Sequence, residues 1–143
     1  MATYSNLLAH IVFTTKGSKN SLHQSMRADL YKFITGVIKN EGGTLIAING
    51  VENHIHLLLA YKPKHSVSEL VKKIKANSSR WIHQNCRGMD LFSWQSGYGV
   101  FSVSESVVPS VIKYIEDQEK HHAKFSYEDE IQIFLEKNNI PTT

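Results

Sequence analysis

The 143-residue sequence predicts an α+β fold, in which an antiparallel sheet is formed by strands that alternate along the chain with amphipathic helices. Two observations support this prediction. Segments with the two-residue period of strands alternate with segments that have the 3.6-residue period of helices. A short turn at residues 50–53 joins two strand segments, as in an antiparallel hairpin. We expect one domain spanning residues 1–143, because a chain of this length can bury one sizeable core.

The first half of the chain contains three of the expected strands. Residues 6–15 are apolar and β-branched, and they lead into a turn that contains Gly17. A helix is expected over residues 21–41, followed by strands at 44–49 and 54–62. The buried stripe of this helix is predicted to consist of Met26, Leu30, Phe33, Ile34, Val37 and Ile38.

Three serines precede Gln or Glu by three residues, which is the capping-box pattern of a helix start. The pairs are Ser21 with Gln24, Ser66 with Glu69, and Ser102 with Glu105. We expect the second pair to open a helix over 66–85, and the third to open a helix that runs to about residue 123. Between these helices, residues 91–103 are rich in aromatic and β-branched residues. They predict a fourth strand, kinked or bulged at Gly97 and Gly99.

A last amphipathic helix is expected over residues 126–137. The complete order is therefore β-α-β-β-α-β with additional C-terminal helices, which is typical of a ferredoxin-like antiparallel sheet. The helices at 21–41 and 66–85 should pack together on one face of that sheet. The strand that begins at His54 should lie close to the helix at 105–123.

Composition excludes several classes of protein. No run approaches 18 apolar residues, so no membrane span is expected. The first five residues lack the basic and apolar regions of a signal peptide, and Cys86 is the one cysteine. We therefore expect a cytoplasmic protein without a disulfide framework. A net charge of +3 is compatible with an anionic partner but does not name one.

The strand at 54–62 begins with the sequence His54-Ile55-His56. Side chains alternate between the faces of a strand, so the two histidines share a face, with Cα atoms about 6.6–6.8 Å apart. Two imidazoles at that spacing can hold one divalent ion between them. The alternative is a pair of half-buried structural histidines, because His-x-His is frequent by chance.

Tyr114 and Gln118 are four residues apart in the helix expected at 105–123, so they share a helix face. They lie at the border of its apolar stripe, where a tyrosine is commonly a core residue with a solvated hydroxyl and a glutamine is commonly surface. Against the histidine strand, Gln118 could supply a third metal ligand and Tyr114 a nucleophile. His121 and His122, one turn further, could contact DNA or be exposed.

Lys72, Lys73, Lys75 and Arg80 project away from the buried stripe of the helix at 66–85. They form either a phosphate-contacting surface or an ordinary solvated helix face. Trp94 and Tyr98 could stack on unpaired bases, although core packing is the more usual role for a tryptophan such as Trp94.

Four segments, in this order, resemble the insertion-sequence-200-like single-tyrosine transposases of the His-hydrophobe-His (HUH) endonuclease superfamily. They are GVENHIHLLL, SVSELVKKIKANSSRWI, WQSGYGVFSVS and YIEDQEKHH. The resemblance implies that His54, His56 and Gln118 bind Mg²⁺ or Mn²⁺ and that Tyr114 is the nucleophile. Relatives often carry an acidic residue where this chain has Asn53.

The same resemblance implies a DNA transposase, that is, an enzyme that acts as a metal-dependent endonuclease and strand transferase. It would cleave and rejoin single-stranded DNA, with hairpins at the element ends, through a 5′-phosphotyrosine intermediate, and it would act as a homodimer. Two alternatives remain. One is a relaxase or replication-initiator nickase of the same superfamily, and the other is a non-catalytic or domesticated module that binds single-stranded nucleic acid.

Overall fold

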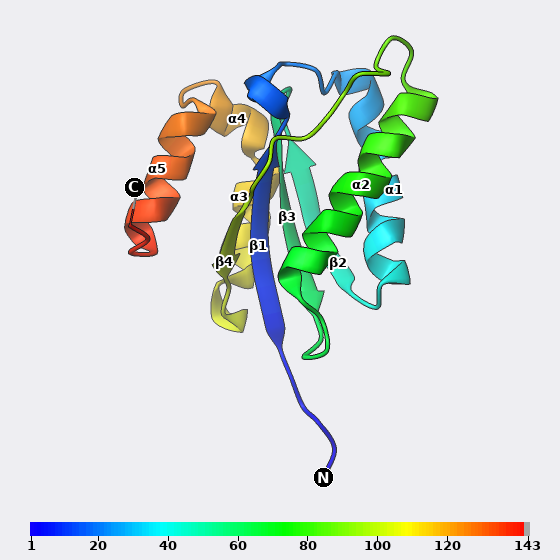
Figure 1. The fold of residues 1–143 in the computed structure, drawn as a ribbon. Coiled ribbons are helices and arrows are strands. Elements are labelled where there is room, and N and C mark those ends of the chain that lie inside the picture. Colours follow the sequence, from blue (N-terminus) through cyan, green and yellow to red (C-terminus); the bar gives the residue numbers. More distant parts are fainter. Residues whose placement is uncertain (142–143) are drawn as a thin grey trace.

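The computed structural model describes residues 1–141, which form a four-stranded sheet with five α-helices (Figure 1). The strands are β1 (Leu7–Thr14), β2 (Thr44–Gly50), β3 (His54–Tyr61) and β4 (Gly99–Ser102). Their order across the sheet is β2-β3-β1-β4, and each neighbouring pair is antiparallel. The predicted fold class is confirmed, and β3, which carries the histidine pair, is one of the two central strands.

The helices form two layers, one on each side of the sheet (Figure 1). The first layer contains α1 (Gln24–Asn40) and α2 (Val67–Asn85), which pack together as predicted. The second contains α3 (Val108–Glu116), α4 (Gln118–His122) and α5 (Tyr127–Lys137). Short 3-10 helices, η1 (Lys16–Ser18) and η2 (Glu105–Val107), follow β1 and β4. None of the helices described has the length and hydropathy of a membrane span.

The main core lies between the sheet and the layer formed by α1 and α2. Alternate residues of β3, among them Ile55, Leu57 and Leu59, are fully buried there. They meet the apolar stripes of the two helices, including Leu30, Ile34, Leu70 and Ile74. Because side chains alternate along a strand, this packing turns His54 and His56 toward the second helix layer.

Gly50 ends β2 at the hairpin that leads into the histidine strand. A Cβ at this position would collide with the carbonyl oxygen of His54 and lie 2.9 Å from the Cα of Ile55. Gly50→Ala is therefore expected to lower the free energy of unfolding by about 1–3 kcal/mol, since the hairpin backbone must move. Urea denaturation measures this change.

Gly36 provides the control for this prediction. It lies in α1, where an added Cβ would meet nothing within 4 Å. Gly36→Ala should raise stability by about 0.5–1 kcal/mol, as alanine does in a helix interior. Equal stability of Gly50→Ala and the wild type would show that the hairpin tolerates the added carbon.

One of the three predicted capping boxes contributes a helix cap. Ser66 accepts a hydrogen bond from the backbone N–H of Glu69 at 3.4 Å and caps α2. The prediction at Ser21 was wrong, because α1 begins at Gln24 after His23, without a side-chain cap. The prediction at Ser102 was also wrong, because this residue still pairs with Ala9 in the sheet.

The fourth strand is much shorter than predicted, since only Gly99–Ser102 of residues 91–103 form β4. Trp94 makes a single isolated bridge to Thr15, and the chain then leaves the sheet. Gly97 has a φ of 88°, a conformation that interrupts a strand. The Lys75 ammonium stabilises this loop between Trp94 and Gly99 by donating hydrogen bonds to the carbonyls of Gln95 and Gly97, at 2.8 and 2.5 Å.

Candidate active site

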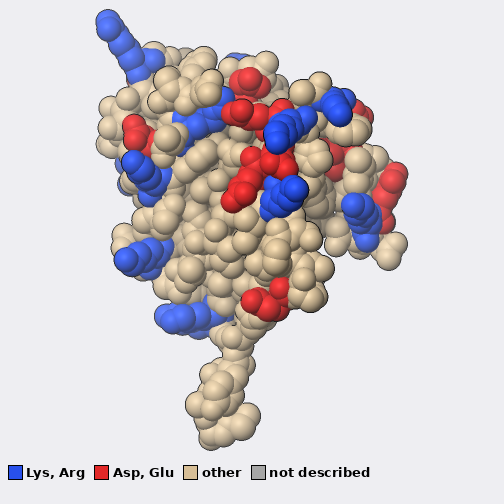
Figure 2. Space-filling view, turned by 180° about the vertical axis from the view of Figure 1, so that it is seen from behind, with Lys and Arg blue, Asp and Glu red and all other residues tan. Residues whose placement is uncertain are grey.

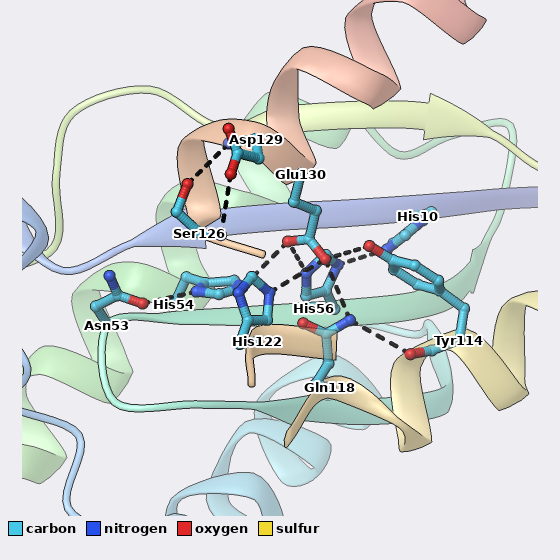
Figure 3. Close-up of polar contacts among 10 residues, drawn as sticks. All are labelled: His10, Asn53, His54, His56, Tyr114, Gln118, His122, Ser126, Asp129 and Glu130. Atoms are coloured by element: carbon cyan, nitrogen blue, oxygen red, sulfur yellow. Dashed lines mark hydrogen bonds and ion pairs between the residues drawn. The ribbon is translucent and has the colours of Figure 1, made fainter. Parts of the chain in front are cut away.

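The histidine pair faces the second helix layer, on the side of the sheet opposite α1 and α2. His54 and His56 are both 0% exposed, as is Gln118 from α4. Figure 3 shows these side chains converging with Tyr114 of α3 and Glu130 of α5. The structure thus brings together all four residues that the sequence suggested for the metal and the nucleophile.

Glu130 lies at the centre of the cluster. Its Oε1 is 2.8 Å from Nε2 of His56 and 3.2 Å from Nε2 of His54, and its Oε2 is 3.3 Å from Nε2 of His122. Potential ligand atoms from these four residues all lie within 4.8 Å of one another. The group offers a second possible set of metal ligands, which includes two residues that sequence reasoning did not place there.

The start of α5 explains how Glu130 reaches the site. Ser126 and Asp129 form a reciprocal capping box, which fixes the first turn of the helix next to the histidines. One turn beyond Glu130, Phe134 stacks on Phe101 with ring centroids 4.9 Å apart. The sequence contained one signal for this placement. Glu130 precedes the apolar Phe134 by four residues, and residues at this spacing share a helix face, so both should face the same neighbour.

Tyr114 donates a hydrogen bond from its hydroxyl to Oε2 of Glu130. Its ring centroid lies 5.7 Å from that of His56, so the tyrosine meets the histidines of its own chain. Burial and the adjacent Glu130 carboxylate raise the pKa of Tyr114 well above its ordinary value. The hydroxyl is therefore protonated at neutral pH and would need assistance to act as a nucleophile.

Gln118 and Tyr114 stay close although the predicted single helix is divided. Asp117, with φ −91° and ψ 19°, separates α3 from α4. The Gln118 amide donates to the carbonyl of Tyr114 at 3.3 Å and to Oε2 of Glu130 at 3.4 Å. Backbone bonds on both sides of Asp117 keep the turn spacing, so the two side chains still share one face.

Three buried atoms at the centre form no hydrogen bond of good geometry with residues 1–141. They are Oε1 of Gln118, Nε2 of His54 and Nε2 of His122. The two imidazole nitrogens face only the Glu130 carboxylate, at 3.2 and 3.3 Å. Imidazole, amide and carboxylate atoms that converge on one point are ligands that suit a divalent cation. This observation supports a metal centre that contains the histidine pair. Its further ligands would be either Gln118 or the pair formed by Glu130 and His122.

Neighbouring side chains orient the two histidines. Nδ1 of His54 donates to Oδ1 of Asn53 at 2.8 Å, so Nε2 is the nitrogen that faces the centre of the cluster. His10 of β1 lies with its Nε2 2.8 Å from Nδ1 of His56. Burial, and secondarily His56, lower the pKa of His10 to about 3, so His10 is neutral. Asn53 thus helps to orient the His54 imidazole.

Charges inside the cluster compensate one another. Burial opposes ionisation of Glu130, but the adjacent histidines outweigh it and hold the pKa of that carboxyl below its usual range. Burial also opposes the charged form of His122, whereas Glu130 raises the pKa of that imidazole overall. At His56 burial dominates and lowers the pKa. The neutral imidazole of His56 is the form that binds metals.

The basic residues named from the sequence lie on α2, beyond the other face of the sheet. Lys72 and Arg80 are exposed, whereas Lys73 forms an ion pair with Glu41. Lys75 is engaged by backbone carbonyls, and burial lowers its pKa. Lys72 and Arg80 are therefore the better candidates for phosphate contacts.

The two aromatic candidates also differ. Trp94 is buried in the core and donates its indole N–H to Oγ of Ser78 at 2.9 Å, while Tyr98 is 40% exposed. On the side turned away from the viewer of Figure 1, acidic side chains gather at the upper middle and basic ones are scattered around them (Figure 2). A DNA strand would meet mixed charge on that side.

Comparison with known proteins identifies the chain as a transposase, a DNA-processing protein. In particular, residues 3–118 match the family model described as transposase IS200 like, so the chain belongs to the IS200-like transposase family. The expected family resemblance is confirmed. The match ends at Gln118, and α5 with Glu130 lies beyond it.

Individual relatives agree with this assignment. The ISDra2 transposase TnpA of Deinococcus radiodurans is 25% identical over 116 residues, which cover 76% of this chain and 81% of the relative. A crystal structure from Deinococcus radiodurans R1, provisionally described as a transposase, has a TM-score of 0.67 and 25% identity over 82% of this chain and 95% of that chain.

A second solved structure is that of a REP-associated tyrosine transposase bound to a REP hairpin. It has a TM-score of 0.65 over 85% of this chain and 74% of that chain. Its identity is 14%, so this likeness supports the fold alone.

Proposed function

We propose that the protein cuts and rejoins single-stranded DNA at the ends of an insertion element, with Tyr114 as the nucleophile. One observation carries the proposal. The two oxygens of Glu130 join the Tyr114 hydroxyl on one side to the His56 imidazole on the other. A phosphate group has oxygens with similar separation, so one phosphodiester could touch both the nucleophile and a metal held by the histidines.

His54 and His56 would hold Mg²⁺ or Mn²⁺, with Gln118 as the third ligand suggested by the sequence. Oε1 of Gln118 is buried without a hydrogen-bond partner among the described residues, which supports this assignment. When bound, such an ion polarises a phosphate and stabilises the charge that develops on it.

The proposed reaction exchanges one phosphoester for another. The Tyr114 oxygen forms a bond to phosphorus, and the bond from phosphorus to the 3′ oxygen of the preceding nucleotide breaks. The tyrosine hydroxyl loses a proton, and the departing oxygen gains one to become a free 3′-hydroxyl. Attack on the 5′-phosphotyrosine by a DNA 3′-hydroxyl reverses these steps, so strands can be rejoined without ATP.

Hairpins at the element ends are the proposed DNA partner, by analogy with the relative bound to a REP hairpin. A homodimer is also part of the proposal, and the exposed edge strand β4 offers a surface for it. The direct test is incubation with the element's single-stranded ends and Mn²⁺. A denaturant-resistant protein–DNA adduct is expected, whereas binding without an adduct would favour the non-catalytic alternative.

Lys72→Ala and Arg80→Ala are each expected to weaken DNA binding and to reduce its salt slope by about 0.7–0.9, because each removes one phosphate contact. Fluorescence anisotropy over a range of salt concentrations measures both quantities. Lys75→Ala is the matched control, since its ammonium already binds two carbonyls and its loss should leave the slope unchanged. Unchanged slopes in all three variants would identify the α2 surface as merely solvated.

A further inference from the structure

The histidine pair is covered by α5 in this structure. His54, His56 and Gln118 are 0% exposed, and Glu130 is 4% exposed. A scissile phosphate must come into direct contact with both the nucleophile and the metal centre. A cavity beside the site reaches Tyr114, His122 and Glu130, and its α5 wall includes Glu130, Phe134 and Lys137. His54 and His56 do not line this cavity, so a phosphate that must also reach them requires α5 to move.

Glu130 occupies the position that the proposed function gives to the scissile phosphate. One oxygen lies at the histidines, and the other accepts the hydrogen bond from Tyr114. The carboxylate is anionic, as a phosphodiester is, and it contacts the same groups. Glu130 and the phosphate therefore exclude each other by both space and charge.

Aromatic contacts hold α5 in this closed arrangement. Phe134 stacks on Phe101, and its ring centroid lies 5.1 Å from that of His10 and 5.6 Å from that of Tyr114. These contacts lie one helical turn from Glu130 and do not involve its carboxylate. Docking of the helix and occupation of the site can thus be perturbed separately, at Phe134 and at Glu130.

We propose that α5 is an internal competitor of single-stranded DNA, which places Glu130 where the scissile phosphate binds and must undock before the strand can enter. The proposal rests on the proposed function of the same site and adds its regulation. It concerns residues beyond the segment that matches the family. Docked and undocked states form a two-state equilibrium that DNA shifts toward the undocked state.

The competition predicts a measurable gain when α5 is weakened. Apparent affinity is reduced by the fraction of molecules in the competent state, and a minor state of roughly 0.1–10% corresponds to a gain of about 10- to 1,000-fold on full opening. Glu130→Gln removes the charge that mimics phosphate, and Phe134→Ala removes the aromatic anchor. Both should bind single-stranded DNA more tightly in EDTA, where no metal contributes.

Two variants of the same helix serve as controls. Glu136→Gln makes the same charge change at an exposed position, and Ile133→Ala shortens a neighbouring side chain that is 42% exposed. Glu136→Gln should change DNA affinity less than Glu130→Gln does, and Ile133→Ala should change it less than Phe134→Ala does. If Glu136→Gln raises affinity as much as Glu130→Gln, the gain is general electrostatics and the proposal is wrong.

Hydrogen exchange provides the direct test of undocking. In wild-type protein, saturating single-stranded DNA should accelerate exchange of the backbone amides of α5, while amides of the central strand β3 stay protected. Unchanged or slower exchange in α5 with DNA bound would overturn the proposal. The proposal would also be overturned if Glu130→Gln lost Mn²⁺ affinity and cleavage together, because Glu130 would then be a metal ligand of the active site.

Failure of the proposed chemistry gives a different result. In that case α5 would still undock and DNA would still bind more tightly to Phe134→Ala, but no covalent adduct would form in any variant. If both proposals hold, adduct formation at saturating Mn²⁺ is faster in Phe134→Ala than in the wild type.

Discussion

Tyr114→Phe is expected to abolish DNA cleavage and the covalent protein–DNA adduct together, while single-stranded DNA still binds. The substitution removes the one oxygen that would bond to phosphorus, and the proposed phosphate contacts lie on α2. The lost hydrogen bond to Glu130 should cost about 0.5–3 kcal/mol of stability, so the fold should survive. Denaturing electrophoresis with labelled DNA detects the adduct, and anisotropy measures binding.

Tyr127→Phe is the matched control, because Tyr127 also lies beside the histidines. Its ring centroid is 4.7 Å from that of His54, and burial raises its pKa to about 12. It makes no contact with Glu130 comparable to the hydrogen bond of Tyr114. The control should retain the adduct. An adduct that persists in Tyr114→Phe and disappears in Tyr127→Phe would move the nucleophile to α5.

His56→Ala is expected to remove Mn²⁺ binding, as measured by calorimetry, and cleavage with it. The imidazole is fully buried and its Nε2 faces the centre of the cluster, so no neighbour can replace it without rearrangement. The loss should exceed the 10- to 100-fold that is typical of removing an outer partner of a ligand. His10→Ala removes such a partner, and its effect should fall in about that 10- to 100-fold range.

His23 supplies the control for the metal experiment, because it is exposed at the start of α1 and its side chain forms no helix cap. His23→Ala should bind Mn²⁺ as the wild type does. Equal binding by His56→Ala and His23→Ala would exclude the histidine strand as the metal site.

Local periodicity was sufficient to predict much of the fold and part of the site. Alternation along β3 correctly placed His54 and His56 on one face, because a strand over a core has its register set by Ile55 and Leu57. The spacing of Tyr114 and Gln118 also survived, since the break at Asp117 preserves one helical turn. These relations depend on residues that are near in sequence.

Relations between distant segments could not be predicted in this way. Glu130 enters the site only because α5 docks beside His10 of β1 and His56 of β3. The spacing of Glu130 and Phe134 indicates a shared helix face but not the surface on which that face docks. Lys75 was predicted to lie on a face that either contacts phosphate or is solvated, but the turn at Gly97 brings two carbonyls to its ammonium. The same turn shortened the predicted fourth strand, because a left-handed glycine conformation ends the pairing.

The wide spacing of the site residues along the chain links metal binding to folding. His10 and His56 are 46 residues apart, and Glu130 is a further 74 residues from His56. The unfolded chain cannot assemble such a set, so an ion that binds here binds the native state alone. At a free concentration 100 times its dissociation constant, the ion would stabilise the protein by about 2.7 kcal/mol. The melting temperature should therefore rise with added Mn²⁺, which makes thermal unfolding a measure of site occupancy that requires no DNA.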